Sequence, residues 1–357
     1  MENVVNVASG AFWHGKRVLL TGHTGFKGGW LALWLHKLGA EVVGVALPPP
    51  ADRPSLFEAA AIGGVVQSHF CDIRDAQALA AIVRQVRPEI VLHLAAQPLV
   101  RASYREPLQT FDTNVMGTAN VLDALRGLPE VRVALCITTD KVYRNEEWPY
   151  PYRETDALGG HDPYSASKAA AELVAACYRD AFLRQQGVAL ATARAGNVIG
   201  GGDWSEDRLL PDAVRAWQDG AVLEIRSPDS VRPWQHVLEP LAGYMQLAQA
   251  LWTQPELAGP YNFGPPSQDT ATVREVVELA RTAYGAGGVA YGLSGNGPHE
   301  AGLLALDTAR SRAVLGLRSR WSLAAGVAET MRWYRAFQEG ADARVLCDAQ
   351  IAAFGPV

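Results

Sequence analysis

Tyr164 and Lys168 stand four residues apart in the stretch Tyr-Ser-Ala-Ser-Lys. In a helix this spacing is about one turn, so the phenol and the ammonium face the same side. A free tyrosine, with a pKa near ~10, is a poor base at neutral pH, but a neighbouring cation favours its ionised form. We therefore expect Lys168 to lower the pKa of Tyr164 and the pair to move a proton at an alcohol. The alternative is an unreactive pair on an exposed helix face.

A second group of reactive side chains comes at the end of a predicted strand, 131–138. It consists of Thr138, Thr139, Asp140 and Lys141. Ligands of α/β sheets bind at the carboxyl ends of the strands, so these polar side chains are expected to emerge there. A carboxyl and an amine side by side can act as acid and base. Taken alone, Asp140 would be a turn residue and Lys141 a solvated charge.

A glycine-rich loop, Gly-His-Thr-Gly-Phe-Lys-Gly, joins a predicted strand at 17–21 to a predicted helix at 28–38. Glycines permit the tight turn and let backbone N–H groups approach a pyrophosphate at the positive end of the helix. A chance glycine-rich turn is the alternative, but the order strand, loop, helix favours a dinucleotide site. The expected cofactor contacts of this loop are Gly22, Thr24, Gly25, Phe26, Lys27 and Gly28.

Two later strand ends support a dinucleotide over a mononucleotide. Asp72 and Ile73 follow the third predicted strand, where an aspartate can accept a hydrogen bond from an adenine amino group. An aspartate after a strand is more often a helix cap. Small residues after the fourth strand let a cofactor lie close to the backbone. They are Leu94, Ala95 and Ala96, and Thr138, Tyr164 and Lys168 complete the expected cofactor contacts.

The second predicted strand, 41–47, lacks the acidic residue that usually holds the adenosine ribose of NAD, because it ends Val45-Ala46-Leu47. Lys27 and Arg53 could attract the 2′-phosphate of NADP, or they could be solvated loop charges. We expect NAD, with NADP as the alternative.

Strands and helices alternate through the first half of the chain. Strands are predicted at 17–21, 41–47, 64–70, 90–94, 131–138 and 188–193, and helices at 28–38, 75–86, 107–125 and 164–185. This alternation is typical of βαβ units. It predicts an α/β fold with a doubly wound (Rossmann) parallel sheet and a smaller C-terminal α+β substrate lobe.

The alternation breaks after Gly196. Helices at 210–219 and 237–252 and short strands at 222–226 and 260–263 follow a glycine-rich loop. We place the cofactor domain at 13–195 and the smaller lobe at 196–357, some segments of which can return to the sheet.

Composition excludes several classes of function. The net charge of −5 comes from interspersed acids and bases, which gives nucleic-acid binding no electrostatic support. The four cysteines form no CxxC pair and the histidines have no metal-ligand spacing, so neither disulfides nor a metal are expected. No run reaches the ~20 apolar residues of a membrane span. The first 12 residues show no signal peptide, and we expect a cytoplasmic protein.

Four motifs together resemble those of the extended short-chain dehydrogenase/reductase family: GHTGFKG, TTDKVY, YSASK and RAGNVIGGGDW. The resemblance runs from about residue 13 to 335 and is greatest to the CDP-glucose 4,6-dehydratase group. It implies that Tyr164 and Lys168 are the catalytic pair and that Thr139, Asp140 and Lys141 are a dehydration triplet. The dTDP-glucose and GDP-mannose dehydratases carry glutamate at the position of Lys141, whereas some inverting UDP-N-acetylglucosamine dehydratases also carry lysine.

This resemblance implies conversion of CDP-D-glucose to CDP-4-dehydro-6-deoxy-D-glucose and water, with a hydride moved internally from C4 to C6. Tyr164 would take the proton of the 4-hydroxyl, Lys141 that of C5, and Asp140 would protonate the departing 6-hydroxyl. Lys141 can do this only as a neutral amine, which burial and the charge of Lys168 would favour. The rival interpretations are a nucleotide-sugar 4-epimerase and a non-catalytic NAD(P)-binding protein.

The substrate's diphosphate needs cations or backbone donors, and arginine suits this task by its bidentate geometry. The resemblance places Asn197 and Arg232 at the phosphates, with Arg208 and Arg226 as further candidates. Gln97 and Arg101 follow the fourth strand and are expected beside the sugar. The resemblance also implies a homodimer or homotetramer built on the helices at 107–125 and 164–185.

Overall fold

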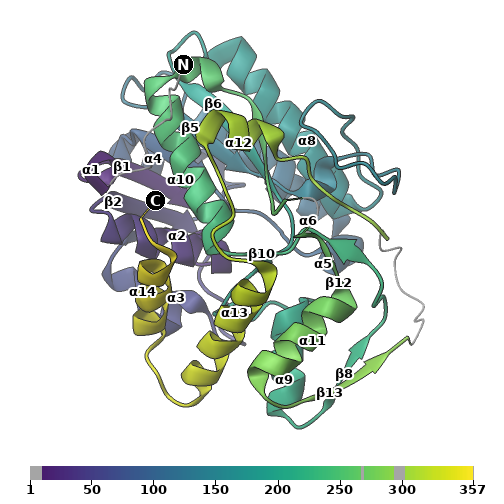
Figure 1. Cartoon of the computed structure of the whole chain (residues 1–357). Helices are drawn as coiled ribbons and strands as arrows, with labels where there is room; N and C mark the ends of the chain where they lie inside the picture. Colours follow the sequence, from purple (N-terminus) through teal and green to yellow (C-terminus); the bar gives the residue numbers. More distant parts are fainter. Residues whose placement is uncertain (1–9, 267–268, 293–301, 357) are drawn as a thin grey trace.

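The computed structural model describes residues 10–266, 269–292 and 302–356 (Figure 1). The first nine residues of the segment examined for a signal peptide lie outside this range. Among the described residues, no helix combines the length and the apolar character needed to cross a bilayer.

A seven-stranded, wholly parallel sheet forms the centre of the molecule. Its strand order is β11-β6-β5-β4-β1-β2-β3. The strands are β1 (Arg17–Thr21), β2 (Glu41–Ala46), β3 (Gln67–Phe70), β4 (Ile90–His93), β5 (Val133–Ile137), β6 (Ala189–Ala195) and β11 (Pro260–Phe263). Connections run outward from β1 in both directions, which confirms the predicted doubly wound fold.

Helices cover both faces of the sheet. Alternate side chains of β1 enter opposite cores, with Val18 and Leu20 in one and Leu19 in the other. The first core also contains residues of α2 (Phe26–Lys37) and α10 (Leu238–Thr253). The second contains residues of α4 (Ala76–Val86), α7 (Gly117–Asp123) and α8 (Pro163–Tyr178). Because both faces are covered, the strands are apolar nearly throughout.

Two helices that the sequence predicts as continuous are interrupted by π-helical turns. The predicted helix at 107–125 consists of α6 (Pro107–Phe111), a π turn η2 (Asp112–Met116) and α7. The predicted helix at 164–185 consists of α8 and a π turn η4 (Arg179–Leu183). Such turns often occur at functional sites.

The remaining short elements connect the layers. They are α1 (Gly10–Trp13), α3 (Leu56–Ala59), α5 (Val100–Arg105), η1 (Ile62–Gly64), η3 (Asp140–Val142) and η5 (Pro255–Leu257). The predicted strand at 64–70 is wrong at its start, because η1 occupies its first residue and β3 begins only at Gln67.

The second half of the chain is divided between the sheet and a smaller region beside it. The smaller region has three short strand pairs, β7–β10, β9–β12 and β8–β13. Their bounds are β7 (Val198–Ile199), β8 (Val222–Ile225), β9 (Val231–Arg232), β10 (Gln235–His236), β12 (Ala271–Thr272) and β13 (Gly288–Tyr291). The helices of the C-terminal half besides α10 are α9 (Leu209–Gln218), α11 (Val273–Tyr284), α12 (Ala309–Leu315), α13 (Leu323–Gln338) and α14 (Ala343–Phe354).

The predicted strand at 260–263 is present, but it does not belong to the smaller region. As β11 it pairs with β6 and extends the main sheet (Figure 1). Helix α10 likewise packs on β5 and β6. The chain therefore returns to the sheet after the expected boundary at residue 196.

Candidate active site

A cleft of about 950 Å³ lies at the carboxyl ends of the central strands. The smaller region supplies its opposite wall through residues of β7, β8 and the loops before α9 and after β9. All but one of the expected site residues line it. They are Gly22, Thr24, Gly25, Phe26, Lys27, Gly28, Asp72, Ile73, Leu94, Ala95, Ala96, Gln97, Arg101, Thr138, Thr139, Lys141, Tyr164, Lys168, Asn197, Arg208, Arg226 and Arg232. The exception is Asp140.

The glycine loop has the shape that a pyrophosphate requires. Gly22 has φ +78°, and a Cβ there would lie 2.7 Å from the backbone nitrogen of Ala95. A Cβ on Gly28 would overlap the carbonyl oxygen of Gly22. The N-cap residue Gly25 leaves the first turn of α2 without a side-chain cap, so its N–H groups remain for a ligand. The loop therefore fits a dinucleotide.

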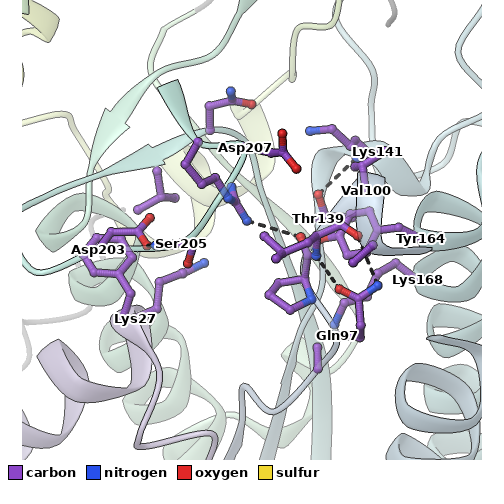
Figure 2. Close-up of a pocket in the computed structure, with 18 of the residues that line it drawn as sticks. Lys27, Gln97, Val100, Thr139, Lys141, Tyr164, Lys168, Asp203, Ser205 and Asp207 are labelled. Atoms are coloured by element: carbon purple, nitrogen blue, oxygen red, sulfur yellow. Dashed lines mark hydrogen bonds between the residues drawn. The ribbon is translucent and has the colours of Figure 1, made fainter. Parts of the chain in front are cut away.

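Lys27 lies elsewhere than the 2′-phosphate interpretation requires. Its ammonium donates to the hydroxyl of Tyr244 on α10 at 3.0 Å. Burial, together with the charges of Lys168 and Arg208, lowers the pKa of Lys27 to about 7, whereas Asp140 acts in the opposite direction. Figure 2 shows Lys27 across the cleft from Tyr164 and Lys168. These cations make the centre of the cleft attractive to anionic phosphates.

Asp72 accepts hydrogen bonds from Arg74, a residue that the sequence analysis did not identify. Arg74 donates from Nε and from Nη2 to its carboxylate, at 3.0 and 2.6 Å to Oδ2, and these hydrogen bonds lower the pKa of Asp72. The helix-cap alternative for Asp72 is wrong, because α4 is capped by Asp75, whose carboxylate accepts from the backbone of Ala78.

Tyr164 and Lys168 lie on the first two turns of α8, which begins at Pro163 after the cap Asp162. Both side chains are buried. Burial raises the pKa of Tyr164, while the charge of Arg208 and a hydrogen bond with Thr139 act against this. The expectation that Lys168 lowers the pKa of Tyr164 is therefore wrong. Lys168 instead donates to the carbonyl of Ile137 at 3.2 Å, and burial lowers its pKa to about 8.

The residues after β5 divide between the cleft wall and the interior. Thr139 and Lys141 face the cleft, but Asp140 is fully buried. Its Oδ1 lies 3.0 Å from Thr139 Oγ1 and 3.5 Å from Lys141 Nζ. Its Oδ2 lies beneath Gly196, where a Cβ would be 3.2 Å away. The expectation that Asp140 itself emerges at the sheet edge is wrong, because the tight turn η3 directs it inward.

The setting of Lys141 also differs from the expectation. Its side chain is 31% exposed and forms an ion pair with the carboxylate of Asp140, 3.5 Å away. The neutral amine that the resemblance requires therefore depends on a change in this pair.

A buried polar group behind the cleft was missed by the sequence reasoning. Glu172 accepts from Thr138 Oγ1 at 2.5 Å, Thr192 Oγ1 at 2.8 Å and Arg194 at 2.7 Å. Glu172 stands one helical turn after Lys168, and that spacing could have identified it. Its carboxylate raises the pKa of Lys168 and so partly offsets the effect of burial.

The expected substrate residues differ in the hydrogen bonds that their side chains make within the protein. The side-chain amide of Gln97 is used internally, since it donates to Thr110 Oγ1 and accepts from the backbone of Leu99. By contrast, the buried Oδ1 of Asn197 has no hydrogen-bond partner within the described parts of the chain. Arg232 donates to the carbonyl of Val231 at 2.8 Å, beside the cleft.

Two contacts join the walls of the cleft. Arg101 on α5 pairs with Asp207 at 3.2 Å, and Arg208 donates to the carbonyl of Pro98 at 3.3 Å. Asp207 has φ +56°, an uncommon conformation for a residue with a side chain. Within the described ranges, no three His, Cys, Asp or Glu residues are grouped so as to hold a metal ion.

Residues 19–330 match the family described as GDP-mannose 4,6 dehydratase. The chain is 45% identical over 350 residues to the CDP-glucose 4,6-dehydratase of Salmonella typhimurium, covering 96% of this chain and 97% of that protein. It is 31% identical to the dTDP-glucose 4,6-dehydratase of Streptomyces antibioticus over 74% of this chain and 75% of the relative.

Solved structures share the fold. A UDP-glucose-4-epimerase from Stenotrophomonas maltophila with bound NAD superposes with a TM-score of 0.79 at 24% identity, covering 92% of this chain and all of the other. The dTDP-glucose 4,6-dehydratase of Bacillus anthracis in complex with NAD gives a TM-score of 0.75 at 21% identity, covering 90% and 97%.

Proposed function

The chain belongs to the nucleotide-sugar 4,6-dehydratases of the extended short-chain dehydrogenase/reductase family, and we propose that it converts CDP-D-glucose to CDP-4-dehydro-6-deoxy-D-glucose and water. One observation carries the proposal. A second acid and base adjoin Tyr164: Lys141 lines the cleft, Asp140 lies buried directly behind it, and Thr139 is hydrogen-bonded to both Asp140 and Tyr164. Oxidation of an alcohol needs only the tyrosine and its lysine, whereas removal of water from C5 and C6 needs a second pair.

NAD is the cofactor of this proposal. Support comes from the glycine loop and the uncapped start of α2. Of the two cations that could attract the 2′-phosphate of NADP, Arg53 is not among the described residues that line the cleft, and Lys27 donates to Tyr244. The pyrophosphate would lie on the loop between Gly22 and Gly28. When bound, the nicotinamide accepts a hydride from C4 of the sugar and returns it to C6.

Tyr164 takes the proton of the 4-hydroxyl, and Thr139 orients the phenol. The nearby guanidinium of Arg208 and the hydrogen bond between Tyr164 and Thr139 both lower the pKa of the phenol, against the effect of burial. Lys168, held against the carbonyl of Ile137, supplies a fixed positive charge from the next turn of α8.

Lys141 and Asp140 perform the elimination. Transfer of one proton from Lys141 Nζ to Asp140 Oδ1, across the 3.5 Å contact, converts the ion pair into a neutral amine and a carboxylic acid. A low-dielectric, closed cleft favours this neutral form. The amine then removes the C5 proton and the carboxylic acid supplies the proton for the departing hydroxide. Because Asp140 is buried, its proton reaches O6 through Thr139 or Lys141, which both line the cleft.

The nucleotide diphosphate is assigned to the smaller region. Asn197, with an unpartnered buried oxygen, and the arginines 208, 226 and 232 line that side of the cleft. In this proposal the seven-stranded sheet, which includes β11, holds the cofactor, and the smaller region beside the sheet holds the sugar nucleotide. Gln97 and Arg101 then border the sugar.

We also propose a homodimer formed by α6, α7 and α8. Helix α8 contacts both α6 and α7. Large apolar side chains of this region are exposed, with fractions of 84% for Leu108 on α6, 62% for Leu173 on α8 and 53% for Met116 on η2. Exposed apolar side chains on packed helices are typical of an interface. All four cysteines lie within the described residues and are free, which supports a reducing cytoplasmic location.

The proposal is tested with CDP-, UDP-, GDP- and dTDP-glucose in separate incubations with NAD. We expect CDP-glucose alone to give a 4-keto-6-deoxy product at a substantial rate. A C4 epimer would identify an epimerase, and exclusive turnover of another nucleotide would leave the chemistry intact but reject the proposed base. No change in any incubation would reject the enzyme interpretation altogether.

A further inference from the structure

His93 stands where the cofactor loop and the catalytic helices meet. It is the last residue of β4 and lies in register with Thr21, the last residue of β1. Its imidazole is buried, with 3% of its surface exposed. Nδ1 lies 2.7 Å from Thr21 Oγ1, and Nε2 lies 3.1 Å from Thr118 Oγ1 on α7. Both ring nitrogens therefore have a partner, on different elements.

The direction of each hydrogen bond follows from counting hydrogens. The hydroxyl of Thr118 donates its one hydrogen to the carbonyl of Asn114, at 2.7 Å. It can therefore only accept from His93, so Nε2 carries the ring proton. Thr21 Oγ1 accepts from the backbone nitrogens of Leu94 and Ala95, both at 3.1 Å, and its own hydrogen is left for Nδ1. Thr21, His93, Thr118 and the carbonyl of Asn114 thus form a row of hydrogen bonds in which each group donates to the next. This arrangement requires a neutral imidazole.

The surroundings favour this neutral form. Burial lowers the pKa of His93 to about 3, and the charge of Lys168 acts in the same direction. The ring is therefore neutral across the whole range in which the enzyme is expected to work.

Both ends of this row of hydrogen bonds adjoin residues that line the cleft, Gly22 at one end and Gln97 at the other. At one end, Thr21 precedes Gly22, where a Cβ would lie 2.9 Å from Ala95 Cα, so Thr21 holds two strand ends together beneath the cofactor loop. At the other end is the π turn η2, whose Asn114 binds the backbone of Gln97 and the hydroxyl of Ser167. Ser167 stands beside Lys168 on α8 and donates to the carbonyl of Tyr164.

We propose that His93 is a positioning residue that aligns the cofactor loop with the catalytic helix, by accepting from Thr21 at Nδ1 and donating to Thr118 at Nε2. It touches neither the substrate nor the cofactor. The assignment rests on the proposed dinucleotide site, and NAD binding by the unmodified enzyme tests that site separately.

Three substitutions test the roles of the two ring nitrogens of His93 separately. His93→Asn keeps an acceptor near the position of Nδ1, His93→Gln keeps a donor near Nε2, and His93→Leu keeps neither. We expect His93→Leu to weaken NAD binding at least about tenfold, since it leaves buried hydroxyls unpaired. His93→Asn should restore the affinity to within about threefold of the unmodified enzyme, and His93→Gln should not. Equilibrium dialysis with NAD measures this.

Val91→Ala is the matched control. Val91 lies two residues earlier on β4, is equally buried and packs only in the second core. The Val91→Ala substitution should lower the melting temperature of the enzyme and leave its affinity for NAD unchanged. If Val91→Ala weakens binding as much as His93→Leu, or if His93→Leu binds NAD normally, His93 is only a packing residue and the proposal is wrong.

A second measurement does not depend on any variant folding. In unmodified enzyme labelled with ¹⁵N-histidine, the ring nitrogens of His93 should report an unprotonated Nδ1 and a protonated Nε2 from pH 6 to pH 8. A protonated Nδ1 in that range would overturn the proposed direction of the row, whatever the variants show. Failure of the unmodified enzyme to bind NAD would instead reject the dinucleotide site.

Discussion

In the proposed mechanism, Lys141 is the base of the elimination. Lys141→Met removes the base but leaves Tyr164, Lys168 and the cofactor loop in place. We expect turnover to fall by about 10²–10⁴-fold, the usual contribution of general acid–base catalysis. Oxidation at C4 should persist, so that reduced cofactor accumulates and can be followed by its absorbance.

The control for this change is Lys37→Met. Lys37 lies at the end of α2 in an exposed pair with Asp348, 3.4 Å away, and far from the cleft wall. Its loss should leave turnover unchanged. Normal formation of the 4-keto-6-deoxy product by Lys141→Met would remove Lys141 from the mechanism.

Lys168 sets the alkaline limit of activity. Its ammonium is present below its pKa of about 8 and is lost as the pH rises through that value. Activity should therefore fall above pH 8, by up to about tenfold per pH unit. Lys168→Arg keeps a positive charge at all these pH values, so the fall near pH 8 should disappear even if the maximal rate is lower. A pH profile of kcat/KM for both proteins checks this, and an unchanged limb in the variant would assign it to another group.

At the level of elements, the close approach of β1 and α2 leaves no room for a side chain at Gly28. Gly28→Ala places a methyl group on the carbonyl of Gly22. Overpacking of this kind costs about 1–3 kcal/mol, and the displaced loop should bind NAD poorly. Calorimetry with NAD measures both stability and affinity.

Gly64→Ala serves as the comparison for this substitution. Nothing lies within 4 Å of a Cβ built on Gly64 in η1, and its φ is not in the left-handed region. It should behave like the unmodified enzyme. Equal NAD affinity in the two alanine variants would mean that the close approach at Gly28 is irrelevant to binding.

The order and kind of the elements were predictable, but their interruptions were not. Apolar periodicity predicted β1 to the residue and α4 to within one residue. The π turn η2 depends on distant partners, since Asn114 binds Gln97 and Ser167 and its carbonyl accepts from Thr118. Nothing in the spacing of residues 107–125 indicates those contacts.

At the level of the whole molecule, the exposed face of α6, α7 and α8 predicts self-association. The double variant Leu108→Glu/Leu173→Glu places two charges on this face, and we expect it to be monomeric in analytical ultracentrifugation. The control is Val345→Glu on α14, where a similarly exposed apolar residue lies on another surface. A variant that remains dimeric would place the interface elsewhere.

By itself, the sequence predicted the parallel sheet, which the structure confirms, and proposed the cofactor loop and the reactive groups. These are local properties, because strand–loop–helix order, glycine spacing and the four-residue step from Tyr164 to Lys168 are set by neighbouring residues.

Only the tertiary structure decided the protonation environment and the boundary of the sheet. Burial raises the pKa of Tyr164, Asp140 turns inward beneath Gly196, and Lys27 points to Tyr244. Strand β11 joins β6 although about 65 residues separate them along the chain. Each of these depends on groups that are distant in sequence and meet only when the chain is packed, which is why residue spacing alone could not predict them.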